Sequence, residues 1–90
     1  SLTVAAGDTV VFKNESDRGV WTATDIHPQH RTYPGSDIQK CFSGDSKEGL
    51  FDSCREVSPG EEWSFQFTEK GEWGFHDHKR PNNKGTVTVE

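Results

Sequence analysis

The sequence has no methionine, only two leucines and two isoleucines, and no long run of apolar residues. Without an apolar run of about 20 residues, no segment is expected to span a bilayer as a helix. Ten basic residues are scattered through a chain of net charge −5, so nucleic acid is not an expected partner. No signal-peptide pattern is visible. No nucleophile elbow and no Gly-rich phosphate loop is visible either, so the usual sequence signals for hydrolases and nucleotide-binding proteins are missing.

The apolar content is just enough for a small core. The 90 residues predict one domain, 1–90, and Leu, Ile, Val and Phe together make up only 17 of them. Three Trp and six Phe argue against disorder, because each large aromatic ring buries much area. A chain of this size hides only about two-thirds of its unfolded surface, so an additional cross-link is expected.

The two cysteines, Cys41 and Cys54, can supply that cross-link. A disulfide between them closes a loop of about 14 residues, which is worth roughly 3 kcal/mol in the chain-entropy model. It also requires an oxidising compartment, so we expect an extracellular, periplasmic or cell-surface protein. The alternative is two free thiols, or two thiol ligands for a metal.

Alternation of apolar and polar residues predicts strands throughout and no long helix. The clearest strand is 62–68, where Trp63, Phe65 and Phe67 alternate with polar residues. Turn residues separate it from the other expected strands, 9–13, 20–24, 72–75 and 85–90. Residues 25–58 lack this period and are expected to form an extended loop held by the disulfide, with one short helical turn. Short strands between regular turns favour a β-sandwich or barrel.

All four histidines fall in two short clusters, "HPQH" with His27 and His30 and "HDH" with His76 and His78. The first pair is three residues apart across Pro28, and the second pair shares one face of a strand. Imidazole suits copper, zinc, iron and nickel, so this pattern predicts a metal site made of these four side chains. The alternative is four ordinary surface histidines.

The strand period also assigns faces around the second cluster. Extending the strand 72–75 places Asp77 on the inner face with Trp73 and Phe75, and places His76 and His78 on the outer face.

Two blocks of the sequence resemble cupredoxins of the plastocyanin-like kind. "LTVAAGDTVVFKNES" (2–16) is similar to their opening strands, and "VSPGEEWSFQFTEKGEWGFHDHKRPNNKGTVTV" (57–89) is similar to their closing half. The resemblance implies an all-β, eight-stranded Greek-key β-sandwich or barrel with a metal at one pole. Because "SLTV" reads as the middle of a strand, we expect the usual first strand to be missing or truncated before Ser1.

The sequence departs from the family at every blue-copper ligand. The first histidine position falls at about Val20 or Trp21, the cysteine position is Asp77, and the following histidine falls near Arg80. A blue site requires the thiolate, so that function is not expected here. The chain instead looks like a divergent subset of cupredoxin-like domains that carry both an HPxH and an HDH motif.

This resemblance and the two clusters together favour an exported copper-binding protein. Copper is expected at His27, His30, His76 and His78, with zinc as the alternative. Asp77 is a further candidate ligand or an acceptor that orients a ligand ring, and Asp25 is a candidate for the second role near His27.

Copper binding or transport is the expected role, with electron transfer next, since the missing thiolate weakens fast electron transfer. Nothing beyond the candidate ligands resembles an acid–base or nucleophile pair, so an enzyme is less expected. A structural zinc module and a small type-2 copper enzyme domain are the alternatives. The expected partners are a metal ion and a redox or copper-delivery protein. A small basic rim, Lys79, Arg80 and Lys84, suits an acidic partner or is a solvated turn. An unpaired sheet edge allows an oligomer.

Overall fold

The structure, a computed structural model, describes residues 1–27, 29–44 and 46–90. Pro28, the predicted turn residue between His27 and His30, lies outside these ranges. Within them the chain forms one 3-10 helix, η1 (Ile38–Cys41), and the following strands: β1 (Leu2–Val4), β2 (Thr9–Lys13), β3 (Thr22–Thr24), β4 (Glu62–Gln66), β5 (Gly71–Asp77) and β6 (Arg80–Val89). None of the described residues belongs to a helix long and apolar enough to cross a membrane.

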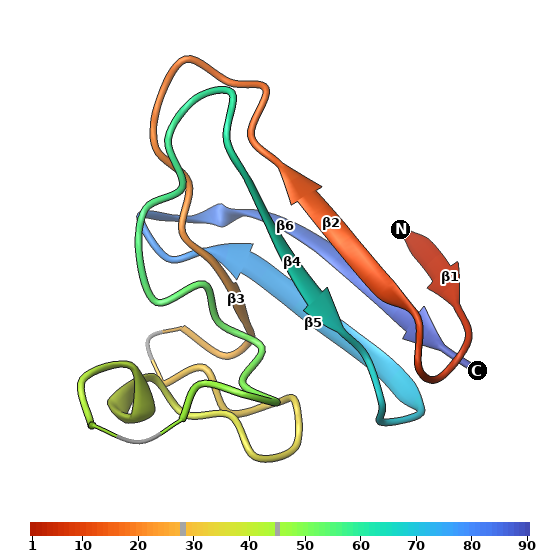
Figure 1. Cartoon of the computed structure of the whole chain (residues 1–90). Helices are drawn as coiled ribbons and strands as arrows, with labels where there is room; N and C mark the ends of the chain where they lie inside the picture. The colour runs from red at the N-terminus through yellow and green to blue at the C-terminus, as the bar shows by residue number, and fades with distance from the viewer. Residues whose placement is uncertain (28, 45) are drawn as a thin grey trace.

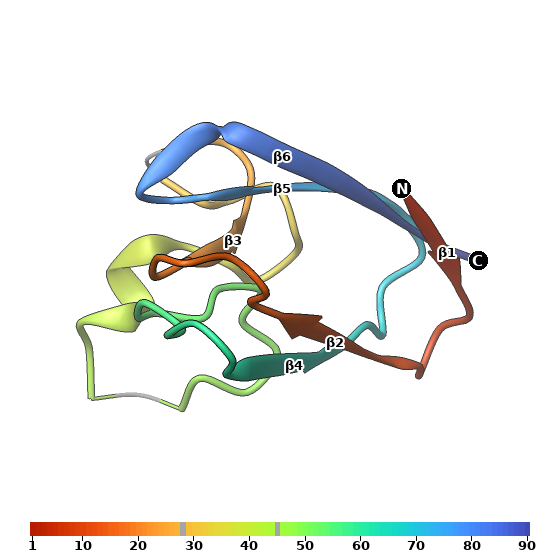
Figure 2. The ribbon, with the colours of Figure 1, turned by 90° about the horizontal axis from the view of Figure 1, so that it is seen from above.

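The strands form two facing sheets, which Figure 1 shows from one side and Figure 2 from above. One sheet has the order β1-β6-β5-β3, with β1 parallel to β6 and the other pairs antiparallel. The other sheet is the antiparallel pair β2 and β4. The sequence prediction of an all-β sandwich is therefore confirmed.

The core lies between the sheets and follows the predicted alternation. Val10 and Phe65 are buried opposite each other on β2 and β4, whereas Val11, the next residue of β2, is 54% exposed. From the other sheet, Val87 and Val89 of β6 are buried against them. The loop 25–58 supplies two more core rings that periodicity did not predict, Tyr33 and Phe51.

The central strands are longer, and the third is shorter, than the sequence predicted. β5 runs on to Asp77 and β6 begins at Arg80, because the two strands form one hairpin through the second histidine cluster. Only Thr22–Thr24 of the predicted strand 20–24 is regular, and all three of its residues are buried. Only isolated bridges, Val20↔Val57 and Ala23↔Asp52, join this part of the chain to the segment 52–57. The described residues therefore form fewer strands than the eight that the family resemblance implies.

The long loop is held by a disulfide, as predicted. Cys41 at the end of η1 is bonded to Cys54, with 5.2 Å between their Cα atoms. The helical turn begins at Asp37, whose carboxylate accepts a hydrogen bond from the Gln39 N–H. Cys54 adopts a φ of 59°, a left-handed conformation that is unusual for a residue other than glycine. The bridge thus fixes the part of the loop that follows Phe51.

Candidate metal centre

The four histidine side chains converge on one point. Each offers one ring nitrogen, and these four nitrogens all lie within 4.8 Å of one another. His30 and His76 are 0% and 2% exposed, His78 is half-buried and His27 is exposed. The two clusters, about 50 residues apart in the sequence, therefore form one four-histidine cluster that reaches from the interior to the surface.

Backbone hydrogen bonds bring the loop after β3 over the outer face of β5. Register pairs Ala23 of β3 with His76 of β5, and the Asp25 N–H then donates to the Gly74 carbonyl over 3.0 Å. The loop turns back through a His30 N–H bond to the Ile26 carbonyl, 2.7 Å long. Gly74 permits this approach, because a Cβ there would collide with the Asp25 carboxylate.

His76 lies on the outer face of β5, as predicted, but that face is covered. Gly74 and His76, two residues apart in β5, both face the loop segment that carries Asp25, whereas Phe75 packs against the core. The outer face is therefore not a solvent-exposed face. The loop after β3 covers it, and strand periodicity has no means of predicting that cover.

Asp77 lies outside the four-histidine cluster. The β5–β6 register shifts between His76 and Asp77. Asp77 Oδ1 accepts from the backbone N–H groups of Trp21 and Lys79, both over 3.0 Å, and its Oδ2 is 3.4 Å from Arg80 Nη1. Instead of orienting a ligand ring, this carboxylate joins the hairpin turn to the segment before β3.

Two other carboxylates hold the buried rings. Asp25 Oδ1 is 2.7 Å from Nδ1 of His76, and Asp52 Oδ2 is 2.7 Å from Nδ1 of His30. The first bond corrects the prediction that Asp25 serves His27. The second was missed, because a single aspartate in an aperiodic loop has no spacing that connects it with His30. The sequence signal for a structural role of Asp52 was its position two residues before Cys54, where an Asp side chain can accept a backbone N–H. Asp52 Oδ1 does accept from the Cys54 N–H, over 2.8 Å.

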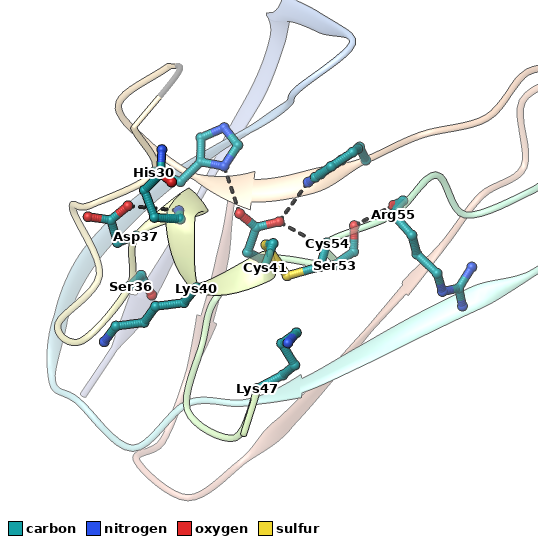
Figure 3. Close-up of a disulfide and its surroundings, with 12 residues drawn as sticks. His30, Ser36, Asp37, Lys40, Cys41, Lys47, Ser53, Cys54 and Arg55 are labelled. Carbon is teal, nitrogen blue, oxygen red and sulfur yellow. Dashed lines mark hydrogen bonds and ion pairs between the residues drawn. A yellow bond between two sulfur atoms is a disulfide. The ribbon is translucent and has the colours of Figure 1, made fainter. Parts of the chain in front are cut away.

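Figure 3 shows Cys41 and Cys54 on one side of His30, and the dashed line from the His30 ring is its hydrogen bond to the Asp52 carboxylate. Asp52 Oδ1 also accepts from the indole Nε1–H of Trp21 over 2.6 Å. The Trp21 ring in turn lies against His78, with 4.8 Å between ring centroids. Asp52 and Trp21 thereby connect rings from both histidine clusters.

These bonds leave two ring nitrogens, Nε2 of His30 and Nε2 of His76, facing each other without a proton to share. A carboxylate only accepts, so Nδ1 carries the proton in His30 and in His76, and Nε2 of each neutral ring is a bare acceptor. Those two Nε2 atoms are 3.2 Å apart, and His78 Nδ1 is 3.1 Å from Nε2 of His30. The lone pairs of the two Nε2 atoms repel at 3.2 Å unless a cation lies between them, whereas His78 can donate an Nδ1 proton to His30.

The surroundings favour neutral rings, the form that binds a metal. Burial lowers the pKa of His76, a shift that its bond to Asp25 partly opposes and that nearby His30 and His27 reinforce. Burial likewise lowers the pKa of His78, and the neighbouring His30 and His27 lower it further.

A second group of potential ligands gathers at Cys41, Asp52 and Cys54. The sulfur atoms of the two cysteines are bonded to each other, and the thiolate is the metal-binding form of cysteine. Cysteine ligation, the alternative left open by the sequence, therefore has no basis in the disulfide-bonded protein.

One side of the four-histidine cluster opens to the surface. A cavity of about 290 Å³ adjoins His27 and His76, and the remaining residues around it are Asp25, Ile26, Pro81, Asn82 and Lys84. The three residues of the predicted basic rim make different contacts. Lys79 pairs with Glu56 over 3.3 Å, Arg80 lies beside Asp77, and Lys84 borders the cavity.

No protein-family model and no curated protein matches this chain. Solved structures do match it. A novel purple cupredoxin from Nitrosopumilus maritimus has a TM-score of 0.71 at 21% identity, over 99% of this chain and 76% of that one.

Two amicyanin structures are similar at the same level. A reduced mutant of amicyanin has a TM-score of 0.65 at 21% identity, over 99% of this chain and 68% of its own. Amicyanin from Paracoccus versutus (Thiobacillus versutus) has a TM-score of 0.65 at 18% identity, covering 98% and 66%. Together with the two-sheet sandwich, these matches show that the chain has the cupredoxin fold.

Proposed function

We propose that this protein binds one copper ion through His27, His30, His76 and His78 and acts in copper binding or transport outside the cytoplasm. The observation that carries the proposal is the 3.2 Å approach of the Nε2 atoms of His30 and His76, each with its Nδ1 bonded to a carboxylate. Two nitrogens that are each about 2.0–2.1 Å from a common ion are separated by about 3 Å at the bond angles of ordinary coordination. The residues therefore fit a shared metal ion.

The donor set favours copper over the other metals that imidazole accepts. All four candidate donors are imidazoles, and for a given nitrogen site affinity rises to a maximum at Cu²⁺ in the first-row series. A structural zinc site is usually closed on all sides, whereas His27 is exposed beside the cavity. Zinc remains the rival ion in the test below.

Exposure of one candidate ligand also supports an exchange role. An ion entering from the cavity meets His27 first and then His76. Rapid electron transfer in blue-copper proteins uses a thiolate, and this cluster contains none. We rank electron transfer second for that reason. The disulfide supports residence in an oxidising compartment such as the periplasm or the cell exterior.

The test is a Cu(II) titration of the wild-type protein, the single variants His30→Ala and His76→Ala, and the double variant. One ion per chain is expected, and each single change should lower affinity at least tenfold. Because both rings serve one ion, the double variant should lose less than the sum of the two single losses. Ser64→Ala, an exposed position on β4 in the other sheet, is the matched control and should bind as the wild type does.

The spectrum of the Cu(II) form supplies a second readout of the same experiment. We expect nitrogen hyperfine structure in paramagnetic resonance and no intense thiolate-to-copper absorption. Additive losses, two ions per chain or an intense sulfur band would contradict the proposal. Tighter binding of zinc than of copper would replace copper with zinc as the bound metal.

A further inference from the structure

The two innermost rings of the four-histidine cluster are each bonded to an aspartate, and the aspartates come from different parts of the loop 25–58. Asp52 is the more buried: its side chain is 0% exposed, like that of His30. It accepts from His30 Nδ1, Trp21 Nε1 and the Cys54 N–H and donates to none of them, which is the hydrogen bonding of a carboxylate. Asp25 lies nearer the surface, and its side chain is 32% exposed.

Among the described residues, neither carboxylate has a lysine or arginine partner. The ion pairs of Asp25 and Asp52 are with His76 and His30 alone. The nearby basic side chains are engaged elsewhere or exposed: Arg80 pairs with Asp77, Lys79 with Glu56, and Lys84 is exposed at the cavity. The two carboxylates therefore have no permanently charged basic side chain beside them, and a bound cation would supply the balancing positive charge.

We infer that Asp25 and Asp52 set the charge of the ion that this site accepts, selecting a divalent over a monovalent cation. The inference rests on the proposed function. A divalent ion with two carboxylates gives a neutral ensemble, whereas a monovalent ion leaves one negative charge uncompensated around a buried group, which is costly. For copper, the site holds Cu(II) in preference to Cu(I). The aspartates are positioning residues that act on the ion through His76 and His30.

The main test variant is Asp25→Asn. An asparagine oxygen still accepts from Nδ1 of His76, so the ring keeps its partner while the charge is lost. Asp17→Asn is the matched control, since the Asp17 side chain is 94% exposed and the change alters net charge equally. Asp52→Asn is the second variant, with thermal unfolding measured alongside, because an amide cannot replace all the bonds that Asp52 accepts.

Affinities are measured by chelator competition for Cu(II) and Zn(II), and under anaerobic conditions for Cu(I) and Ag(I). We expect Asp25→Asn to weaken Cu(II) and Zn(II) binding about 10- to 100-fold. Binding of Cu(I) and Ag(I) should change less than threefold, and the control should leave all four affinities unchanged. A tenfold change in the Cu(II) to Cu(I) affinity ratio corresponds to a rise of about 59 mV in the copper reduction potential.

Equal losses for monovalent and divalent ions would overturn the inference, because the aspartates would then act only by orienting the rings. The same holds if the wild-type protein binds Cu(I) and Ag(I) as tightly as Cu(II). In both cases the proposed function still stands. Failure of the wild-type protein to bind Cu(II) at all would instead remove the proposed function.

Discussion

At the scale of single residues, Trp21 joins the two halves of the candidate site. Its Nε1–H donates to Asp52 over 2.6 Å, and its ring lies against His78. Trp21→Phe keeps an aromatic ring in place but removes a donor from a buried carboxylate. Hydrogen bonds to charged groups contribute about 1.5–3 kcal/mol, so the variant should lose that much stability in urea unfolding of the metal-free protein.

Trp73→Phe provides the comparison for this prediction. It removes an Nε1–H bond to the Glu69 carbonyl, an exposed and neutral acceptor, so a loss of only about 0.5–1.5 kcal/mol is expected. Equal losses of stability in the two variants would mean that the bond to the Asp52 carboxylate stabilises the protein no more than a bond to a neutral carbonyl.

Single residues also mark the limit of what the sequence could predict about the site. The spacings in "HPQH" and "HDH" are local, and they were sufficient to select the four histidines that converge. The partners of those rings depend on contacts across the fold: Asp52 is 22 residues from His30, and Asp25 is 51 residues from His76. No local pattern distinguishes these aspartates from the others in the chain.

At the scale of elements, the disulfide links η1 to the segment that carries Asp52. Neither cysteine belongs to the four-histidine cluster, so its chemistry is separate from the proposed ligands. Cys41→Ser/Cys54→Ser should cost roughly 3 kcal/mol, because the unfolded chain gains freedom. For a domain of this size that is a fall of about 12–24 °C in Tm, measured by calorimetry.

The metal content of the same variant decides between two roles for the cysteines. One copper per chain should remain after the double substitution, as it should after chemical reduction of the wild-type protein. Release of the ion in either case would contradict the separation of the cysteines from the candidate site.

Elements with a clear period were predictable and the others were not. β4 and its partner β2 were apparent because apolar and polar side chains alternate, which is what a sheet with one buried face requires. β3 has buried residues on both faces, since the loop after it covers the side that an ordinary outer strand exposes. Whether a loop folds back over a sheet depends on long-range contacts such as the Asp25–Gly74 bond, and periodicity contains none of that information.

At the scale of the whole molecule, the sequence features that indicate the fold differ from those that form the candidate site. Two flanking blocks of sequence were sufficient to indicate a cupredoxin-like sandwich, because they form the strands that pack across the core. The candidate site, in contrast, takes its rings from the β5–β6 hairpin and from the loop after β3, while Asp77 binds backbone N–H groups.

Stability of the whole molecule should depend on pH through the buried rings. Burial lowers the pKa of both His76 and His78 below the ordinary 6.5. Below that pH the unfolded chain therefore takes up protons that the folded, metal-free protein does not, and stability must rise with pH in this window. The stability that depends on these two rings being neutral is fully present above about pH 6.5, and it is lost as the pH falls toward the folded-state pKa values.

Urea unfolding of the metal-free protein at several pH values between 7.5 and 5.5 measures this effect. The wild-type protein should lose stability over that interval, and His76→Gln/His78→Gln should show a flatter profile, because glutamine does not titrate. Parallel profiles would mean that the two rings are as easily protonated in the folded protein as in the unfolded chain. Saturating copper should steepen the wild-type dependence, since protons compete with the metal for the same nitrogens and bound metal stabilises only the folded state.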